Sequence, residues 1–303
     1  TLLYLPQEWV EGPDYADVRD EVHLPQGTRF QTKHELAWTL YEKAKAAGVT
    51  ARAVTGDAEY GKNAEIRRRL RADRQPYALA VQPRHTRFID PDAPLSEPGR
   101  NGVVHYPEGT PCESAKEIAA RIPGWTTVPW GEGTKGKLTG RFARLRVRVT
   151  EESQEKRCAT DEVGWLLLED RTNELKAYVC WGLDDATLEE LVEIAHLRWT
   201  IEHYHKEAKQ ILGLDRFEGR TWMGWNHHVA VVLLAYAFLA TLRAEHDRTR
   251  GPLPALAAVA QTLVEEFTAQ EIEREHRLPL PQARRFAKTA VRVLWGRPTK
   301  RGQ

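Results

Sequence analysis

The sequence predicts an α/β fold that is interrupted by a β-rich segment and followed by helices. Three observations lead to this prediction. Helix-like and strand-like segments alternate between residues 30 and 82, strand-like patterns with Pro, Gly and Trp clusters occupy residues 83–183, and helical spacing dominates from Ala186 to about Phe267. A regular alternation of helices and strands is typical of a sheet with crossover helices.

The composition of the 303 residues is that of a globular protein. Hydrophobic residues make up 41%, which allows a buried core. The 44 Lys and Arg against 43 Asp and Glu give a net charge of +1, so nucleic-acid binding would depend on local clusters of basic residues. The three cysteines are scattered without C-x-x-C spacing, which argues against a disulfide scaffold or a zinc ribbon and favours a cytoplasmic protein.

We expect neither a membrane span nor a signal peptide. No apolar run reaches the ~18–20 residues that cross a bilayer, since even Val229–Leu242 includes a Tyr and stops near Arg243. The segment Thr1–Gly12 lacks the basic start and the apolar stretch of a signal peptide. A membrane is therefore not expected among the partners.

The first third of the chain is expected to be irregular up to Arg29 and regular after it. Periodicity and turn residues predict four elements there. They are a helix over Thr32–Ala47 ended by Gly48, a strand over Arg52–Thr55 ended by Gly56-Asp57, a helix over Asn63–Ala72, and a strand over Tyr77–Val81.

The β-rich segment contains three stretches with strand patterns, which are Phe142–Val149, Leu166–Glu169 and Lys176–Trp181. Basic residues cluster in and around this segment and at the end of the chain. We expect these clusters to be candidates for phosphate contacts or solvated faces. They are Arg67, Arg68, Arg69, Arg71 and Arg74; Arg141, Arg144, Arg146 and Arg148; and Arg284, Arg285, Lys288, Arg292, Arg297, Lys300 and Arg301.

One long helix is expected from a cap at Asp184-Asp185 to about Leu212. Six of its residues share an apolar face that we expect in the core: Ile194, Leu197, Ile201, Tyr204, Ala208 and Ile211. Four polar residues share a second face: Arg198, Glu202, His205 and Lys209. In isolation, that second face is typical of a solvated helix with an ordinary Arg–Glu pair.

The wider pattern around this helix points to a known family. The motifs are R-x3-E-x6-K, G-L-D-x-[FY]-E-x-R from Gly213 and W-x-G-W-x-x-H from Trp222. This stretch resembles the DDE transposases of bacterial insertion sequences, in the group named for a Y-R-E-K signature. Three upstream segments also resemble that family: LYLPQEWV, FQTKHELAWTLYEKAKAAGV and AVTGDAEYGKNAEIRRRL.

The resemblance implies an RNase H-like fold, with a mixed sheet, flanking helices and a β-rich insertion before the helix that bears a catalytic Glu. On this basis we expect four regions. They are a partial catalytic core over residues 1–82, a β-rich insertion over 83–183, completion of the core by the Glu-bearing helix and the following helix over 184–246, and a helical, basic region over 247–303.

The same resemblance implies the site residues. Asp57 matches the second acidic ligand of the family and Glu202 the third. Arg198 and Lys209 match the basic members of the signature, which contact DNA near the cleaved phosphate, and we add Lys206 to these DNA-binding candidates. The position of the signature Tyr, three residues before the Arg, holds Ala195 here.

These residue types suit metal-dependent phosphodiester cleavage. Two divalent ions activate the attacking oxygen and stabilise the leaving oxygen. Carboxylates suit Mg²⁺, or Mn²⁺ as a substitute, whereas arginine and lysine can hold the phosphate. The resemblance therefore implies two-ion chemistry on double-stranded DNA, at the element ends and at the target.

Trp125 and Trp130 lie in the inserted region and are candidates for stacking on a base flipped out of the duplex. Core packing is the alternative for both. The resemblance also implies a homodimer on paired DNA ends, in the bacterial cytoplasm and on the nucleoid when bound to DNA.

We assign no residue of this sequence to the role of the family's first catalytic Asp. Asp14, Asp17 and Asp20 lie in a Pro- and Gly-flanked segment without a preceding strand. We therefore expect that the chain lacks the N-terminal part of the family and is inactive as it stands. Two alternatives stay open: a catalytically dead DNA-binding remnant of a transposase, and a host RNase H-like nuclease unrelated to mobile DNA.

Overall fold

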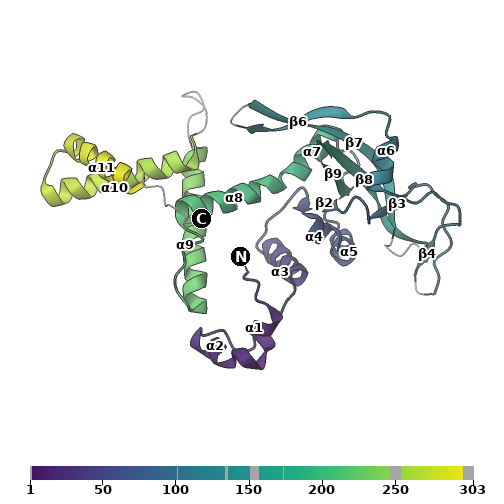
Figure 1. The fold of residues 1–303 in the computed structure, drawn as a ribbon, viewed down its shortest axis with the longest axis horizontal. Helices are drawn as coiled ribbons and strands as arrows, with labels where there is room; N and C mark the ends of the chain where they lie inside the picture. Colours follow the sequence, from purple (N-terminus) through teal and green to yellow (C-terminus); the bar gives the residue numbers. More distant parts are fainter. Residues whose placement is uncertain are drawn as a thin grey trace. The chain divides into compact units, whose positions relative to one another are not determined.

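The computed structural model describes residues 2–100, 102–133, 136–150, 157–172, 174–245 and 254–295 (Figure 1). The chain divides into two compact units. The first unit comprises Thr1–Gln7 and Phe30–Ile201, and the second comprises Glu8–Arg29 and Glu202–Gln303. Pro252 and the basic residues Arg297, Lys300 and Arg301 lie outside the described residues.

A mixed sheet forms the centre of the first unit (Figure 1). Its order is β1-β2-β9-β8-β7-β3-β5, with β4 paired to β8 and β6 paired to β7. Strands β1 and β2 are parallel, and the other strand pairs among the described residues are antiparallel. The strands are β1 Val54–Gly56, β2 Tyr77–Val81, β3 Arg87–Ile89, β4 Val104–His105, β5 Glu113–Ser114, β6 Thr126–Gly133, β7 Gly136–Thr150, β8 Cys158–Arg171 and β9 Glu174–Trp181.

Helices pack on both faces of this sheet. On one face, α3 (Lys33–Ala46), α5 (Ala64–Ala72) and α6 (Ala115–Arg121) pack against alternate residues of β2, β7, β8 and β9. On the other face, α7 (Leu188–His196) packs against the intervening residues of β2, β8 and β9. The strands are apolar on both faces because both faces are covered. The predicted α/β fold with a mixed sheet and following helices is confirmed.

Local sequence signals set most element ends in the first third of the unit. Thr32 accepts a hydrogen bond from the backbone N–H of Glu35 and Glu35 accepts one from that of Thr32, so a capping box begins α3. Gly48 follows α3 with φ of +77°, a conformation that favours glycine. Strand β2 has the predicted bounds, and β1 begins two residues later than predicted.

The long helix predicted up to Leu212 is two helices. Helix α7 begins after Thr187, whose side chain forms a capping box with Glu190, and so the cap predicted at Asp184-Asp185 is wrong. Helix α8 (Arg198–Leu212) begins directly after Leu197. The predicted core face is also wrong in part, since Leu197 and Ile201 are each 50% exposed. The apolar periodicity continues across the break between α7 and α8, so the sequence pattern does not indicate where the first helix ends.

The second unit is helical. Its two small apolar clusters join α9 to α10 around Leu239 and Leu256, and α10 to α11 around Ala269 and Ala283.

The segment before Arg29 was predicted to be irregular but contains short helices. The helices are α1 Gln7–Glu11, a 3-10 turn Pro13–Tyr15, α2 Ala16–Glu21, α4 Ala58–Gly61 of the first unit, α9 Trp222–Ala244, α10 Leu256–His276 and α11 Leu280–Trp295.

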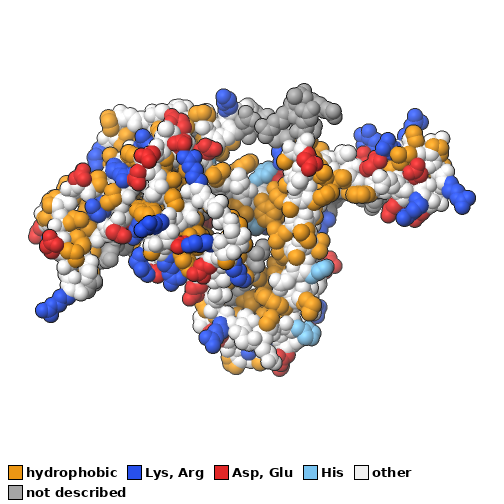
Figure 2. All heavy atoms as spheres, turned by 180° about the vertical axis from the view of Figure 1, so that it is seen from behind, with side chains coloured by type: hydrophobic (Ala, Val, Ile, Leu, Met, Phe, Trp, Pro, Cys, Tyr) orange, Lys and Arg blue, Asp and Glu red, His pale blue; other side chains and the backbone are white. Residues whose placement is uncertain are grey.

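Helix α9 has an exposed apolar surface (Figure 2). Val231, Leu234 and Phe238 are 50%, 71% and 54% exposed. Among the described residues, α9 is the one helix long and apolar enough to cross a membrane, because it begins at Trp222 and not near Val229. Length and composition alone are weak evidence for a membrane span, and the core helices of other proteins pass the same test.

Candidate active site

A hollow of about 330 Å³ lies at the carboxyl ends of β1 and β2 in the first unit. Asp57 follows β1, Gln82 follows β2, and both line the hollow together with Arg198 at the start of α8. The carboxyl ends of neighbouring parallel strands meet at one sheet edge, where ligand sites of α/β proteins commonly form. Two predicted site residues that are far apart in the sequence, Asp57 and Arg198, thus meet in one hollow.

Among the described residues, one of the two oxygens of the Asp57 carboxylate accepts a hydrogen bond. Asp57 is the N-cap of α4, and its Oδ1 accepts a hydrogen bond of 2.9 Å from the backbone N–H of Glu59. Among the described residues, no group donates to its Oδ2, and the side chain is exposed. Burial and the nearby Asp57 charge raise the pKa of Tyr60. The carboxylate is therefore oriented by the cap while one oxygen stays accessible.

Gly61 brings the loop after Asp57 close to the sheet. A Cβ at this position would lie 1.8 Å from the carbonyl oxygen of Ala80 on β2. Only glycine allows this approach of α4 to β2. The Arg67 guanidinium donates to the carbonyl of Gly61 and fixes the same turn. The position of Asp57 relative to β2 thus depends on Gly61.

Strand β9 supplies the second wall of the hollow with Glu174, Lys176 and Tyr178. These residues were missed by the sequence analysis. Strand β9 runs antiparallel to β2, with Ala177 opposite Val81, so the start of β9 lies beside the end of β2. The strand pattern at Lys176–Trp181 predicted β9 itself, but no local signal shows which strand it pairs with.

A buried carboxylate, Glu169 of β8, lies behind this wall. It accepts hydrogen bonds from Arg171 at 2.6 and 3.0 Å and from the Tyr178 hydroxyl at 3.4 Å, and it lies 3.4 Å from Nε2 of His196. Burial and the Glu169 charge raise the pKa of Tyr178. Burial lowers the pKa of His196, although Glu169 opposes the shift. These contacts tie the end of α7 to the sheet two residues before Arg198.

The other predicted residues of α8 belong to the second unit. Glu202, Lys206 and Lys209 are exposed on α8, four, eight and eleven residues after Arg198. Ala195, at the position of the signature Tyr, is buried in α7. The meeting of Asp57 with Glu202 stays a prediction.

Comparison with known families gives a match over residues 2–137, to the family described as DDE superfamily endonuclease. The match covers less than half of the 303 residues and supports a DDE transposase-like domain in that part of the chain. The match includes Asp57 and its strand, and it ends before Arg198 and Glu202, so the Y-R-E-K signature stays a prediction. No curated protein matches the chain.

A DDE domain indicates a nuclease of the transposase type, with DNA as its substrate. Such domains generally use divalent metal ions, and the exposed oxygen of Asp57 is a suitable hard donor. Among the described residues, however, no group of three or more His, Cys, Asp or Glu side chains lies close enough to hold a metal ion.

The two tryptophans predicted to stack on DNA contact the protein core of the DDE domain. Trp125 packs beside the first apolar cluster, with the Arg141 guanidinium 5.8 Å from its ring centroid. Trp130 packs beside the second cluster, with its ring centroid 4.3 Å from that of His196. Both keep part of their surface exposed, and base stacking stays a prediction for each.

The basic run on α5 differs from the expected solvent-facing cluster. Arg67 and Arg71 are buried, with 5% and 9% exposure, and pair with Glu162 of β8. Arg68 and Arg69 pair with Glu65 on the helix surface. Carboxylates therefore pair with Arg67, Arg68, Arg69 and Arg71, so the run is not simply a solvated face, and its phosphate contacts stay a prediction.

Proposed function

We propose that this chain is the catalytic region of a DNA transposase that cuts and joins strands at the ends of an insertion sequence. The observation that carries the proposal is the hollow shared by Asp57 and Arg198. An acidic ligand and a phosphate-binding arginine in one hollow of a DDE domain are what phosphodiester cleavage requires.

Asp57 and Glu202 are the residues that would hold Mg²⁺, or Mn²⁺ as a substitute. Bound in pairs, such ions activate the attacking oxygen and stabilise the leaving oxygen. In this proposal, Asp57 presents its accessible Oδ2 to the metal site, because Oδ1 is occupied by the Glu59 N–H.

Arg198 orients the scissile phosphate in this proposal. Its guanidinium matches two phosphate oxygens at once, which a lysine cannot do. Helix geometry supports the role of Glu202: four residues of an α-helix rise about 6 Å and turn slightly more than once. Helix α8 therefore carries Glu202 one turn beyond Arg198 on a similar side. Lys206 and Lys209, further along α8, would contact the DNA backbone.

The proposed partners are double-stranded DNA, at the element ends and at the target, and a second copy of the protein on paired ends. The setting is the bacterial cytoplasm, on the nucleoid when DNA is bound. These proposals rest on the DDE match and on the sequence resemblance.

The test uses the gene product that contains this sequence, with Mn²⁺ and DNA that carries the element ends. Asp57→Asn and Glu202→Gln are expected to abolish cleavage while DNA binding stays within a few fold. Asn still caps a helix, so loss of activity in Asp57→Asn would not come from loss of α4. Glu193→Gln, at an exposed position of α7, is the matched control and should cut normally.

Two results would contradict the proposal. Cleavage at the wild-type rate by Asp57→Asn or Glu202→Gln would remove these residues from the active site. Binding of element ends by the wild-type protein without any cleavage would favour the catalytically dead remnant instead.

A further inference from the structure

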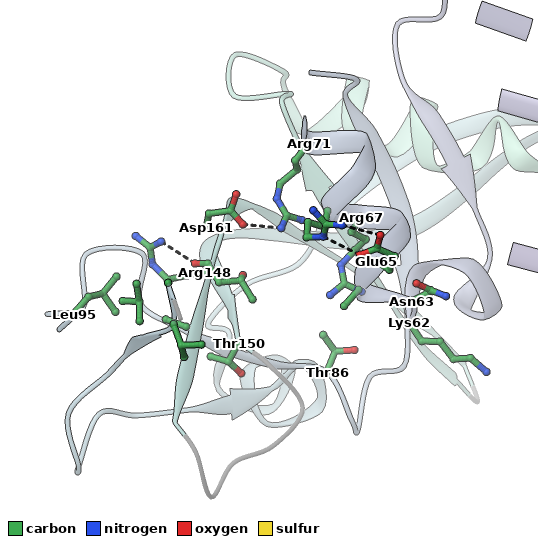
Figure 3. A pocket seen from close by; sticks show the side chains of 17 residues that line it. Lys62, Asn63, Glu65, Arg67, Arg71, Thr86, Leu95, Arg148, Thr150 and Asp161 are labelled. Carbon is green, nitrogen blue, oxygen red and sulfur yellow. Dashed lines mark hydrogen bonds and ion pairs between the residues drawn. The ribbon is translucent and has the colours of Figure 1, made fainter. Parts of the chain in front are cut away.

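The first unit contains a second, larger hollow of about 900 Å³. It lies between α5, the ends of β7 and β8, and the segment around Leu95 and Val104 (Figure 3). None of its lining residues lines the Asp57 hollow. Arginine side chains face it from both sides: Arg67 and Arg71 from α5, and Arg148 from β7 (Figure 3).

On the α5 side, two arginines share one buried carboxylate. The Nε of Arg67 lies 3.0 Å from both oxygens of Glu162, and Nη1 of Arg71 lies 3.0 Å from Oε2 of the same residue. Nη2 of Arg71 donates to Asp161 at 2.7 Å, but the Asp161 side chain is 79% exposed. Although burial alone would lower the pKa of Arg71, these two carboxylates raise it, so the guanidinium stays charged.

On the opposite side, Arg148 has no carboxylate partner among the described residues. Its Nη1 donates to the carbonyl of Thr160 at 3.1 Å and its Nη2 to that of Pro91 at 3.0 Å. A guanidinium has five N–H donors, so these two bonds leave three of them. The Nε is buried and has no hydrogen-bond partner within the described part of the chain.

Arg148 lies next to an irregularity in the pairing of β7 with β8, which helps to position its side chain at the hollow. The register between β7 and β8 shifts between Arg148 and Thr150, where Arg148 pairs with Val163 and Thr150 with Ala159. Such bulges redirect side chains and are common beside functional sites. The two carbonyl contacts then fix the guanidinium at the wall of the hollow.

Among the residues that the structure describes, the charges of the hollow do not balance. Four guanidinium groups line it, those of Arg67, Arg68, Arg71 and Arg148, whereas the described carboxylates that pair with them are Glu65, the largely hydrated Asp161 and the buried Glu162. At the rim, Lys62 is already paired with Glu59, and Arg68 with Glu65. Charges that are removed from water are normally paired, so the excess positive charge favours an anion inside.

We propose that this hollow binds a phosphate group, with Arg148 as its main ligand and Arg71 as the second. Phosphate oxygens match the planar donor pattern of a guanidinium. A volume of about 900 Å³ also accommodates a sugar and a base. The phosphate belongs to free phosphate, to a mononucleotide or to a DNA strand, and the site is separate from the proposed cleavage site.

Isothermal titration calorimetry on the folded protein tests this proposal, with metal omitted and ionic strength held constant. The probes are inorganic phosphate, a deoxynucleoside monophosphate and a short single-stranded oligonucleotide. We expect saturable binding of at least one probe, weakened tenfold or more by Arg148→Gln. Arg141→Gln is the matched control, because Arg141 lies on the same strand, is exposed and pairs with Asp170 outside the hollow.

The pattern among the probes identifies the source of the phosphate. Equal affinity for phosphate and nucleotide indicates a simple anion site, tighter binding of the nucleotide indicates a nucleotide site, and binding of the oligonucleotide alone indicates a DNA contact. Each of these three binding patterns supports the proposal if Arg148→Gln weakens the binding. The absence of binding to the wild-type protein, or equal weakening by Arg141→Gln, would overturn it.

Thermal unfolding without ligand shows whether Arg148→Gln is folded. If it is not, the wild-type titrations still decide whether an anion binds, and Arg148→Lys, which keeps the charge, should retain part of the affinity. No cleavage is measured, so failure here leaves the roles of Asp57 and Glu202 untouched, and failure of those roles leaves this site untouched.

Discussion

Helices α5 and α11 carry similar runs of basic residues but place them in opposite surroundings. On α5, Arg67 and Arg71 are buried against Glu162 of a distant strand. On α11, Arg285, Lys288 and Arg292 are exposed, and the helix contains no acidic residue. One run therefore stabilises the sheet, whereas the other presents positive charge to solvent.

The difference arises from the neighbouring element. Helix α5 packs on the sheet, and β8 brings Glu162 to its buried side. Helix α11 packs on α10 through the small residues Ala283 and Ala287, and an ion pair joins Arg284 to Glu266 of α10. Helical periodicity puts Arg285, Lys288 and Arg292 on the side away from those alanines. A run of basic residues in a sequence thus does not reveal whether it binds a partner or the protein itself.

The largest expected effect comes from removing the shared carboxylate of α5. Glu162→Gln should lower the free energy of unfolding by about 3–5 kcal/mol, because the buried Arg67 would lose its carboxylate partner and the buried Arg71 would keep only the exposed Asp161. Urea denaturation measures this change. Glu65→Gln, which removes only surface pairs of the same helix, is the control and should cost less than about 1 kcal/mol. Equal, small losses would show that the two arginines are not effectively buried.

The second prediction concerns α11. Replacing Arg285, Lys288 and Arg292 by Gln together should leave stability within about 0.5 kcal/mol. The same change should weaken DNA binding and lower the slope of log affinity against log salt by up to about 3, since each phosphate contact contributes about 0.9. Fluorescence anisotropy at several salt concentrations measures the slope. Arg284→Gln is the control, and a slope unchanged by the triple substitution would exclude α11 from the DNA interface.

The smallest effect is a pH dependence at the surface of α5. Hydrogen bonds from Arg68 and Arg69 lower the pKa of Glu65 from 4.5 to about 2. The stabilisation of the folded state by the ionised Glu65 carboxylate is therefore complete above pH 4.5 and is lost as the pH falls toward 2. The stability difference between wild type and Glu65→Gln should shrink between neutral pH and about pH 3, by less than about 1 kcal/mol because the pair is exposed. A difference that stays constant over this range would contradict the pairing.

The sequence predicted those features that local signals determine. Apolar periodicity and Gly48 predicted α3, and the apolar run Tyr77–Val81 was β2 itself. Asp57 was identified because the segment AVTGDAEYGKNAEIRRRL resembles the stretch that carries the second acidic ligand of the transposase family. The α7–α8 boundary at Leu197 was missed, since the apolar period continues across it.

The parts of the site that depend on distant pairing were not predictable. Glu174 and Tyr178 reach the hollow only because β9 pairs with β2, and Arg67 is buried only because β8 brings Glu162 beside it. Nothing in the residues around these positions specifies their partners. The role of Glu202 rests on motif resemblance and stays a prediction.

The pairing of β2 with β9 also has a consequence for synthesis of the protein. Asp57 and its strand leave the ribosome more than 100 residues before the wall formed by Glu174–Tyr178 and before Arg198. The nascent chain therefore holds an incomplete sheet edge while these residues are made, and contacts so distant in sequence form slowly. The hollow that would bind a phosphodiester cannot close around one until synthesis has passed α8.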